Sequence, residues 1–207
     1  FTITSQWVPQ NALAQNIGYS HCDMDIMEYI GGKLYVGSDG GISIANNPTT
    51  VNSNYFTDLS VGLGIRQFYK IGISQTNPVI MTGGSQDNGT SVFRTDGAWY
   101  DWLGADGMET FVDKTNSNIL YGTTQFGSLY KSLNAGNTRL DIATPDNKSG
   151  NWVTPFEQDP MVANVIYTGY DQVYKSTNSG DSWTAISQNF GGNLDHLKIA
   201  PSNNQIM

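Results

Sequence analysis

A unit of about 43 residues recurs along the chain, and a repeat of this length limits the possible folds more than any other feature. Five segments with the composition of a strand begin near Asp23, Gly64, Gly107, Trp152 and Leu194. Their starts are separated by 41, 43, 45 and 42 residues, a spread that loops of different length accommodate. A regular period of this size predicts one supersecondary unit that is repeated in space.

Each unit contains the same four strand-like segments in the same order. Polar turns rich in Asn, Pro and Ser separate the first segment from the second, as chain reversal requires. Pro155 is expected to precede the regular ladder of its unit. The second segments cover 33–38, 79–85, 119–124 and 165–170, the third segments 41–46, 91–95, 128–132 and 172–176, and the fourth segments 54–60, 98–103, 138–143 and 182–187.

Four-stranded antiparallel units repeated around an axis form a β-propeller. We therefore predict an all-β fold with blades at 23–63, 64–106, 107–151 and 152–193, and with 194–207 as the first strand of a further blade. Open ring edges are normally covered. For this reason we expect residues 1–207, including the strand-like 1–8, to be part of one larger ring whose remaining blades are partners.

Composition excludes several classes of protein. Hydrophobic residues make up 38% of the chain and charged residues only 14%, which favours many short strands. A net charge of -8 disfavours nucleic acid as a partner. The longest apolar runs have strand length, so no membrane-spanning segment is expected. Cys22 is the single cysteine, and no cofactor is expected. A structural calcium site at Asp23, Asp25 or Asp106 stays an open alternative, although the sequence contains no D-x-D-x-D-G motif.

Three short segments resemble the Asp-box hairpin, S-x-D-x-G-x-x-W, of sialidase-like and sortilin-like propellers. Ser176–Trp183 reads STNSGDSW with Asn178 in place of the usual Asp, Ser132–Arg139 is a weaker copy, and Arg94–Trp99 is a shortened one. Nearly all of the chain, including the segments KLYVGSDGGI, GGSQDNGT, GADGME, YGTTQFGSLYKS and GNWVTPFEQDP, is also similar to the BNR-repeat proteins that Bacteroidetes-type bacteria export. The resemblance implies a secreted or cell-surface propeller in which Asn178 has a structural role.

The loops that connect second to third strands, and those that lead into each unit, should lie at one end of the blades. The predicted ligand-binding residues there are Asp39, Asp87, Asp106, Phe126, Tyr170 and Asp171, with Gln125, Asp195, His196 and the lead-in residues Tyr19, His21, Asp23 and Asp25 nearby. Carboxylates among aromatic rings suit sugar binding or glycoside hydrolysis. Asp-Gly and Asn-Gly pairs are also ordinary turn formers, so a purely structural role stays open.

These residues match the catalytic residues of two enzyme classes to different degrees. Sialidases use an arginine triad, whereas the only arginines here are Arg66, Arg94 and Arg139, and the last two belong to outer strands or their turns. The run from Tyr35 to Gly41 resembles, with one residue fewer, the Y-x-x-x-D-x-G-G loop of xyloglucanase-like hydrolases, which implies Asp39 as one catalytic carboxylate. The preferred hypothesis is a module that binds a glycan or a protein, and the alternative is a secreted glycoside hydrolase.

Overall fold

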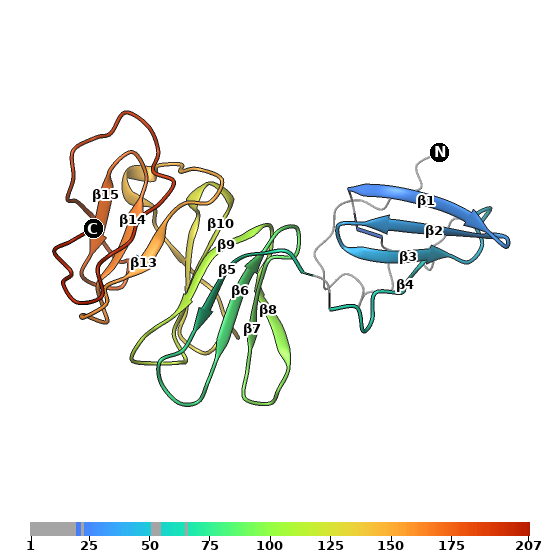
Figure 1. Cartoon of the computed structure of the whole chain (residues 1–207), viewed down its shortest axis with the longest axis horizontal. Helices are drawn as coiled ribbons and strands as arrows, with labels where there is room; N and C mark the ends of the chain where they lie inside the picture. The colour runs from blue at the N-terminus through green and yellow to red at the C-terminus, as the bar shows by residue number, and fades with distance from the viewer. Residues whose placement is uncertain (1–19, 22, 51–54, 65) are drawn as a thin grey trace. The chain divides into compact units, whose positions relative to one another are not determined.

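The computed structural model describes residues 20, 21, 23–50, 55–64 and 66–207, and in these residues the protein is all-β (Figure 1). Only two single-turn 3-10 helices, η2 (Gln125–Gly127) and η3 (Pro145–Asn147), interrupt the strands of this part. None of its helices has the length and apolar character needed to cross a bilayer. The chain divides into two compact units, residues 1–66 and 67–207, which are described separately.

The first unit contains one four-stranded antiparallel sheet in the order β1–β2–β3–β4. Its strands are β1 (Met24–Ile30), β2 (Lys33–Ser38), β3 (Gly41–Ala45) and β4 (Phe56–Asp58). Val36, Ala45, Tyr55 and Phe56 form its buried apolar cluster. The two-residue connection between β2 and β3 places Asp39 and Gly40 at the tip of a tight hairpin, in which Ser38 and Gly41 are partners.

The second unit contains three further sheets of the same kind, each antiparallel and each running through its strands in chain order. The first has β5 (Phe68–Ile73), β6 (Met81–Ser85), β7 (Thr90–Phe93) and β8 (Trp99–Leu103). The second has β9 (Gly107–Val112), β10 (Leu120–Thr124), β11 (Leu129–Ser132) and β12 (Leu140–Ile142). The third has β13 (Phe156–Gln158), β14 (Ile166–Gly169), β15 (Val173–Ser176) and β16 (Thr184–Ala185).

These sheets are the four-stranded antiparallel blades of a β-propeller, as the repeat predicts. Each strand of the four sheets overlaps a segment expected to form it, although β7 begins one residue before the expected 91–95, and Pro155 precedes β13. The second strands β10 and β14 are buried along their whole length, because both of their faces are covered, whereas most of the fourth-strand residues in β12 and β16 are exposed. That the whole chain belongs to one larger ring stays a prediction.

Neighbouring sheets of the second unit are held together by apolar clusters. One joins Ile80, Val92, Trp102 and Leu103 of the β5–β8 blade to Val112 and Leu120 of the next. The following cluster joins Tyr121, Leu129 and Ile142 to Phe156 and Ile166. Burial of apolar surface contributes roughly 25 cal/mol per Å², so these clusters are the main source of stability in a fold without longer helices.

The turn between first and second strands repeats closely. The backbone N–H of Ser74, Asp113 and Asp159 donates to the carbonyl six residues later at 2.8–2.9 Å, and Ala200 donates to Ile206 at 2.9 Å in the same way. The first strand predicted within 194–207 is nevertheless absent as a strand, because the segment forms this turn bond but no paired ladder with a neighbouring strand. Leu197 and Ile199 of this segment still pack on Val165, Tyr167 and Val173.

Candidate functional site

Three aromatic residues from three different blades of the second unit meet in one surface cluster, which we call the aromatic rim: Tyr69, Phe126 and Trp152. Tyr69 lies on β5, Phe126 in η2 after β10, and Trp152 in the loop before β13. The Trp152 Nε1–H donates to the Tyr69 hydroxyl at 3.0 Å, a contact between residues 83 positions apart. The edge of one ring faces the other in the Phe126–Trp152 pair, with ring centroids 5.3 Å apart and planes at 81°.

The loop backbone holds Phe126 in place. Phe126 has φ +62° and ψ +17°, a left-handed conformation that is uncommon for a bulky residue and costs roughly 1–3 kcal/mol. Its N–H donates to the carbonyl of Trp152 at 3.3 Å, and its carbonyl accepts from Gly150 at 2.8 Å. The phenyl ring is nevertheless 51% exposed and the Trp152 side chain 42% exposed. The structure therefore orders two large apolar rings at the surface instead of burying them.

Tyr69 continues the hydrogen-bond chain into the next loop. Its hydroxyl donates to Gln86 Oε1 at 2.8 Å, and Gln86 follows β6 directly. Close to it in sequence, the N–H of Asp87 donates to Asp106 Oδ1 at 2.9 Å, and the N–H of Asp106 donates to Gln125 Oε1 at 3.3 Å. The predicted residues Asp87, Asp106 and Gln125 are thus linked to one another, and Gln125 precedes Phe126 in the chain.

Glu109 on β9 is a carboxyl group that sequence reasoning missed. Its side chain is only 12% exposed and forms an ion pair with Lys70 of β5 at 3.1 Å. Burial raises the pKa of Glu109, and the positive charge of Lys70, with smaller contributions from Lys198 and His196, opposes this rise. Tyr69 and Lys70 are adjacent on β5, so the same strand carries one ring of the rim and the partner of Glu109.

Two predicted ligand-binding residues, Tyr170 and Asp171, are held by hydrogen bonds within the chain. Tyr170 is fully buried, and its hydroxyl donates to the carbonyl of Gly127 at 2.6 Å, so its prediction as a ligand contact is wrong. Tyr170 instead supports η2 through this hydrogen bond to Gly127, the last residue of η2. Asp171 accepts from Lys148 at 2.7 Å and from Asn189 at 2.6 Å, and the Lys148 hydrogen bond lowers the pKa of Asp171.

The remaining predicted positions are spread over the two units. Asp39 lies exposed at the β2–β3 turn of the first unit, where its N–H donates to the carbonyl of Asp23 at 3.4 Å. His21 is buried against Gly40, and Asp25 is exposed. In the second unit His196 is exposed, and Asp195 accepts from Asn151 at 2.6 Å. Tyr19, Cys22 and the segment 1–8 lie outside the described residues, and a calcium site stays a prediction.

The two segments that most resemble the Asp-box fold into the same polar hairpin. Asn134 Oδ1 accepts from the N–H of Thr138 at 2.9 Å, and Asn178 Oδ1 accepts from the N–H of Ser182 at 2.9 Å. In each hairpin the serine four residues earlier also accepts the N–H of the glycine, Gly136 at 2.9 Å and Gly180 at 2.8 Å. Asn178 therefore has the structural role that was expected.

No protein-family model matches this sequence, and no curated protein matches it either. Among solved structures, an ancestral GH74 enzyme is 16% identical with a TM-score of 0.49, covering 80% of this chain and 24% of its own. The GH74 xyloglucanase from Xanthomonas campestris is 14% identical with a TM-score of 0.43 and coverages of 76% and 27%. A Niastella koreensis GH74 enzyme is 13% identical with a TM-score of 0.32 and coverages of 84% and 44%. The chain thus spans less than half the length of each of these proteins, and likeness at this level carries no information on its activity.

Proposed function

We propose that the chain is a binding module whose ligand is a glycan and whose binding surface is the aromatic rim. The observation that carries this proposal is the hydrogen bond from Trp152 to Tyr69, which fixes an exposed indole beside the exposed ring of Phe126. An ordered apolar ring with polar groups at its border fits the alternating apolar and hydroxyl-bearing faces of a sugar.

The energetics of the rim favour binding without rearrangement. A ligand that stacks on Trp152 does not have to immobilise a freely rotating side chain, because the indole is already held by Tyr69 and Phe126. Ordering one rotamer-rich side chain on binding costs roughly 0.5–1.5 kcal/mol, so this pre-organisation strengthens a weak surface contact. The net charge of -8 further favours an uncharged ligand over a polyanion.

The proposal also places the chain among exported Asp-box propellers, at the cell surface or in the medium. The support is the shared hairpin of Asn134 and Asn178 and the composition, which is poor in charge and rich in Gly, Asn, Ser and Thr. An extracellular glycan is the ligand class that such a location would offer.

Binding to an array of neutral and acidic polysaccharides, followed by calorimetry on the best ligand, tests the rim. Trp152→Ala and Phe126→Ala should each weaken binding at least tenfold, since aromatic contacts dominate small binding surfaces. Trp99→Ala is the matched control, because Trp99 is 48% exposed, lies on β8 and is packed on Phe68 and Phe93. Glycan binding that is unchanged in Trp152→Ala, or lost equally in Trp99→Ala, would refute the assignment.

The buried carboxyl group of Glu109 favours the alternative function, glycoside hydrolysis. A carboxyl group whose pKa is raised by burial retains its proton to higher pH and suits a general acid. Asp39 remains the carboxylate that the loop resemblance implies. Release of reducing ends from polysaccharides by the unmodified chain, abolished by Glu109→Gln or Asp39→Asn with binding retained, would establish hydrolysis. Binding without any release would leave the binding module as the function.

A further inference from the structure

Two rings of the aromatic rim stand at almost a right angle to each other. The ring planes of Phe126 and Trp152 make an angle of 81°, and their centroids are 5.3 Å apart. When the edge of one ring meets the face of another, the two ring faces enclose a corner beside the first ring. Both side chains are exposed, so the pair forms a corner with two apolar walls, which we call the aromatic corner.

The size of the aromatic corner limits what it can hold. Aromatic rings in direct contact have centroids roughly 4.5–7 Å apart, so the two walls touch and no sugar fits between the rings. A pyranose that stacks on one wall therefore has its edge against the other wall. The next sugar of a glycan chain lies beyond both rings, and the corner has room for the apolar face of one sugar.

The third ring of the rim does not extend the two walls. Tyr69 is half-buried, and its hydroxyl is bonded to the edge of the indole of Trp152 and to Gln86. Among the described residues, Phe126 and Trp152 pair with each other and with no further ring. A flat glycan chain presents its successive sugars in one plane, so a backbone stretch would need a second ring parallel to the first. The rim does not offer such a platform.

Polar groups at the border of the corner suit the hydroxyl groups of one sugar. The Trp152 Nε1–H is used by Tyr69, so the indole contacts a ligand through its apolar face. The Tyr69 hydroxyl accepts this bond and donates to Gln86 Oε1, which leaves one of its two lone pairs for a sugar hydroxyl. The Gln86 Nε2 group forms no hydrogen bond within the described residues, and it supplies a donor beside that lone pair.

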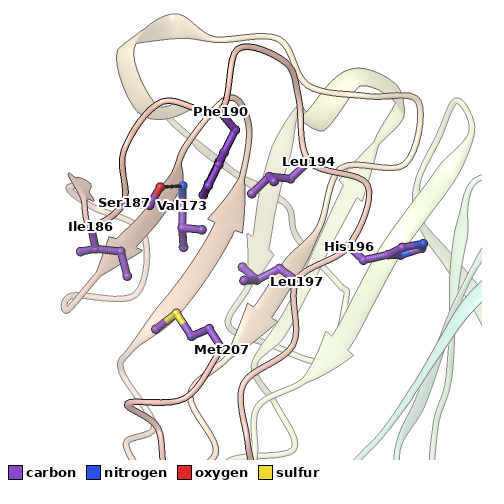
Figure 2. A pocket seen from close by; sticks show the side chains of 8 residues that line it. All are labelled: Val173, Ile186, Ser187, Phe190, Leu194, His196, Leu197 and Met207. Carbon is purple, nitrogen blue, oxygen red and sulfur yellow. Dashed lines mark hydrogen bonds between the residues drawn. The ribbon is translucent and has the colours of Figure 1, made fainter.

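A phenylalanine of equal exposure lacks this geometry. Phe190 is 51% exposed, as is Phe126. Figure 2 shows Phe190 among aliphatic side chains such as Val173 and Leu194, which line an apolar cavity of about 300 Å³. No second aromatic ring pairs with Phe190 in the part of the chain that the structure describes. The cavity also includes Met207, the last residue of the sequence, and is no basis for a ligand assignment. Phe190 is instead a matched comparison for Phe126.

We propose that the aromatic corner binds a single sugar residue, so that its ligand is the end or a one-sugar side branch of a glycan and not a stretch of glycan backbone. This inference rests on the proposed function and specifies its ligand. The sugar is uncharged, because the carboxylate of Asp106 and the neighbouring Asp87 belong to the same hydrogen-bonded loops as Gln86 and repel an acidic sugar.

Calorimetric titration of the full chain with sugars of different length tests the inference. The probes are the methyl α- and β-glycosides of glucose, mannose, xylose and N-acetylglucosamine, and the linear hexasaccharides of the same sugars. At least one methyl glycoside should bind. Its dissociation constant should lie within about threefold of that of its own hexasaccharide, because the added sugars contact neither ring.

A variant without the second wall gives an independent test. Phe126→Gly removes the ring and is compatible with the left-handed φ of +62°, so the loop keeps its conformation. It should weaken the binding of the methyl glycoside and of the hexasaccharide by the same factor, about fivefold, because the same sugar loses the same contact. Phe190→Ala is the matched control and should leave both dissociation constants unchanged.

The outcomes separate this inference from the proposed function. A hexasaccharide that binds roughly tenfold or more tightly than its methyl glycoside would overturn the single-sugar inference and leave the proposed glycan-binding function in place. Binding that is unchanged in Phe126→Gly, or weakened equally in Phe190→Ala, would also overturn it, because the sugar would then lie elsewhere. No binding by any probe of either length would overturn both the inference and the proposed function.

Discussion

One buried amide, that of Gln158, links two blades of the second unit, and replacing Gln158 by alanine tests how much this link contributes to stability. Gln158 is 4% exposed at the end of β13. Its Nε2 donates to Asp113 Oδ2 and to the carbonyl of Ala163, each at 2.6 Å, and its Oε1 accepts from the N–H of Lys114 at 2.9 Å. Asp113 and Lys114 belong to the preceding blade, so the substitution removes two of the polar links across the interface.

The expected loss follows from these contacts. The bond to the buried Asp113 carboxylate is worth about 1.5–3 kcal/mol, and each uncharged bond about 1 kcal/mol. Water that enters the vacated space compensates part of this sum, so we expect the free energy of unfolding to fall by about 3 kcal/mol. Asn204→Ala is the matched control, because Asn204 bonds to Asp159 in the same way at 3.0 and 3.2 Å. Asp159 keeps the Tyr167 hydroxyl at 2.9 Å, and water can replace the amide of Asn204 because Asn204 is only half-buried, so this variant should lose only about 1 kcal/mol.

Urea unfolding followed by tryptophan fluorescence measures both variants. With a slope of about 2–3 kcal/mol per M, the midpoint should fall by roughly 1 M for Gln158→Ala and by roughly 0.4 M for Asn204→Ala. The slope itself should stay constant, which shows that the folded state remains intact. Equal midpoints for the two variants would refute the reasoning, because burial of the amide would then make no difference to its contribution.

Three further substitutions have defined outcomes. Glu109→Gln should remove a pH dependence: above the ordinary value of 4.5 and up to the raised pKa, the folded protein binds more protons than the unfolded chain, so its free energy of unfolding falls as pH rises. Urea titrations over this range that give parallel pH profiles for both proteins would contradict this. Gly180→Ala should lower the melting temperature by several degrees more than Gly97→Ala, since both have positive φ but only Gly180 faces a neighbour within 4 Å. Tyr170→Phe should cost about 1–3 kcal/mol in urea unfolding, because the carbonyl of Gly127 loses its partner, and unchanged stability would disprove the support of η2.

The blades were predictable because each repeats a pattern that local chemistry determines. The second strands predicted at 33–38 and 119–124 are apolar runs between turn residues. The observed strands β2 and β10 match these predicted ranges to within one residue. Fourth strands were predicted too long, since β16 contains only Thr184–Ala185 of the expected 182–187. A fourth strand pairs with a neighbour on one side only, so the residues at its ends form fewer hydrogen bonds. The observed strand is therefore shorter than the sequence pattern predicts.

The candidate site was predicted only in part, because its geometry depends on contacts between distant loops. Phe126 was identified from its place between the second and third strands, and it is exposed there. Trp152 was assigned to the start of a strand, whereas β13 begins at Phe156 and leaves Trp152 in the preceding loop. No local signal indicates that its indole reaches Tyr69. Tyr170 is the opposite case, since its place directly after a strand predicts exposure, whereas the residue is buried.

The rim lies where the repeat departs most from its average, and this gives the departure a physical meaning. The interval from Gly107 to Trp152 is the longest, at 45 residues, and its loops contain η2 and η3. A residue in the repeated pattern packs between blades, so its side chain is not available to contact a ligand. The connection between β12 and β13 is longer than that between β8 and β9, and its residues Gly150 and Trp152 lie outside the repeated strands, yet hydrogen bonds with Phe126 and Tyr69 order them. Ordered, exposed aromatic rings outside the packing pattern indicate binding more strongly than any acidic residue in a repeated turn does.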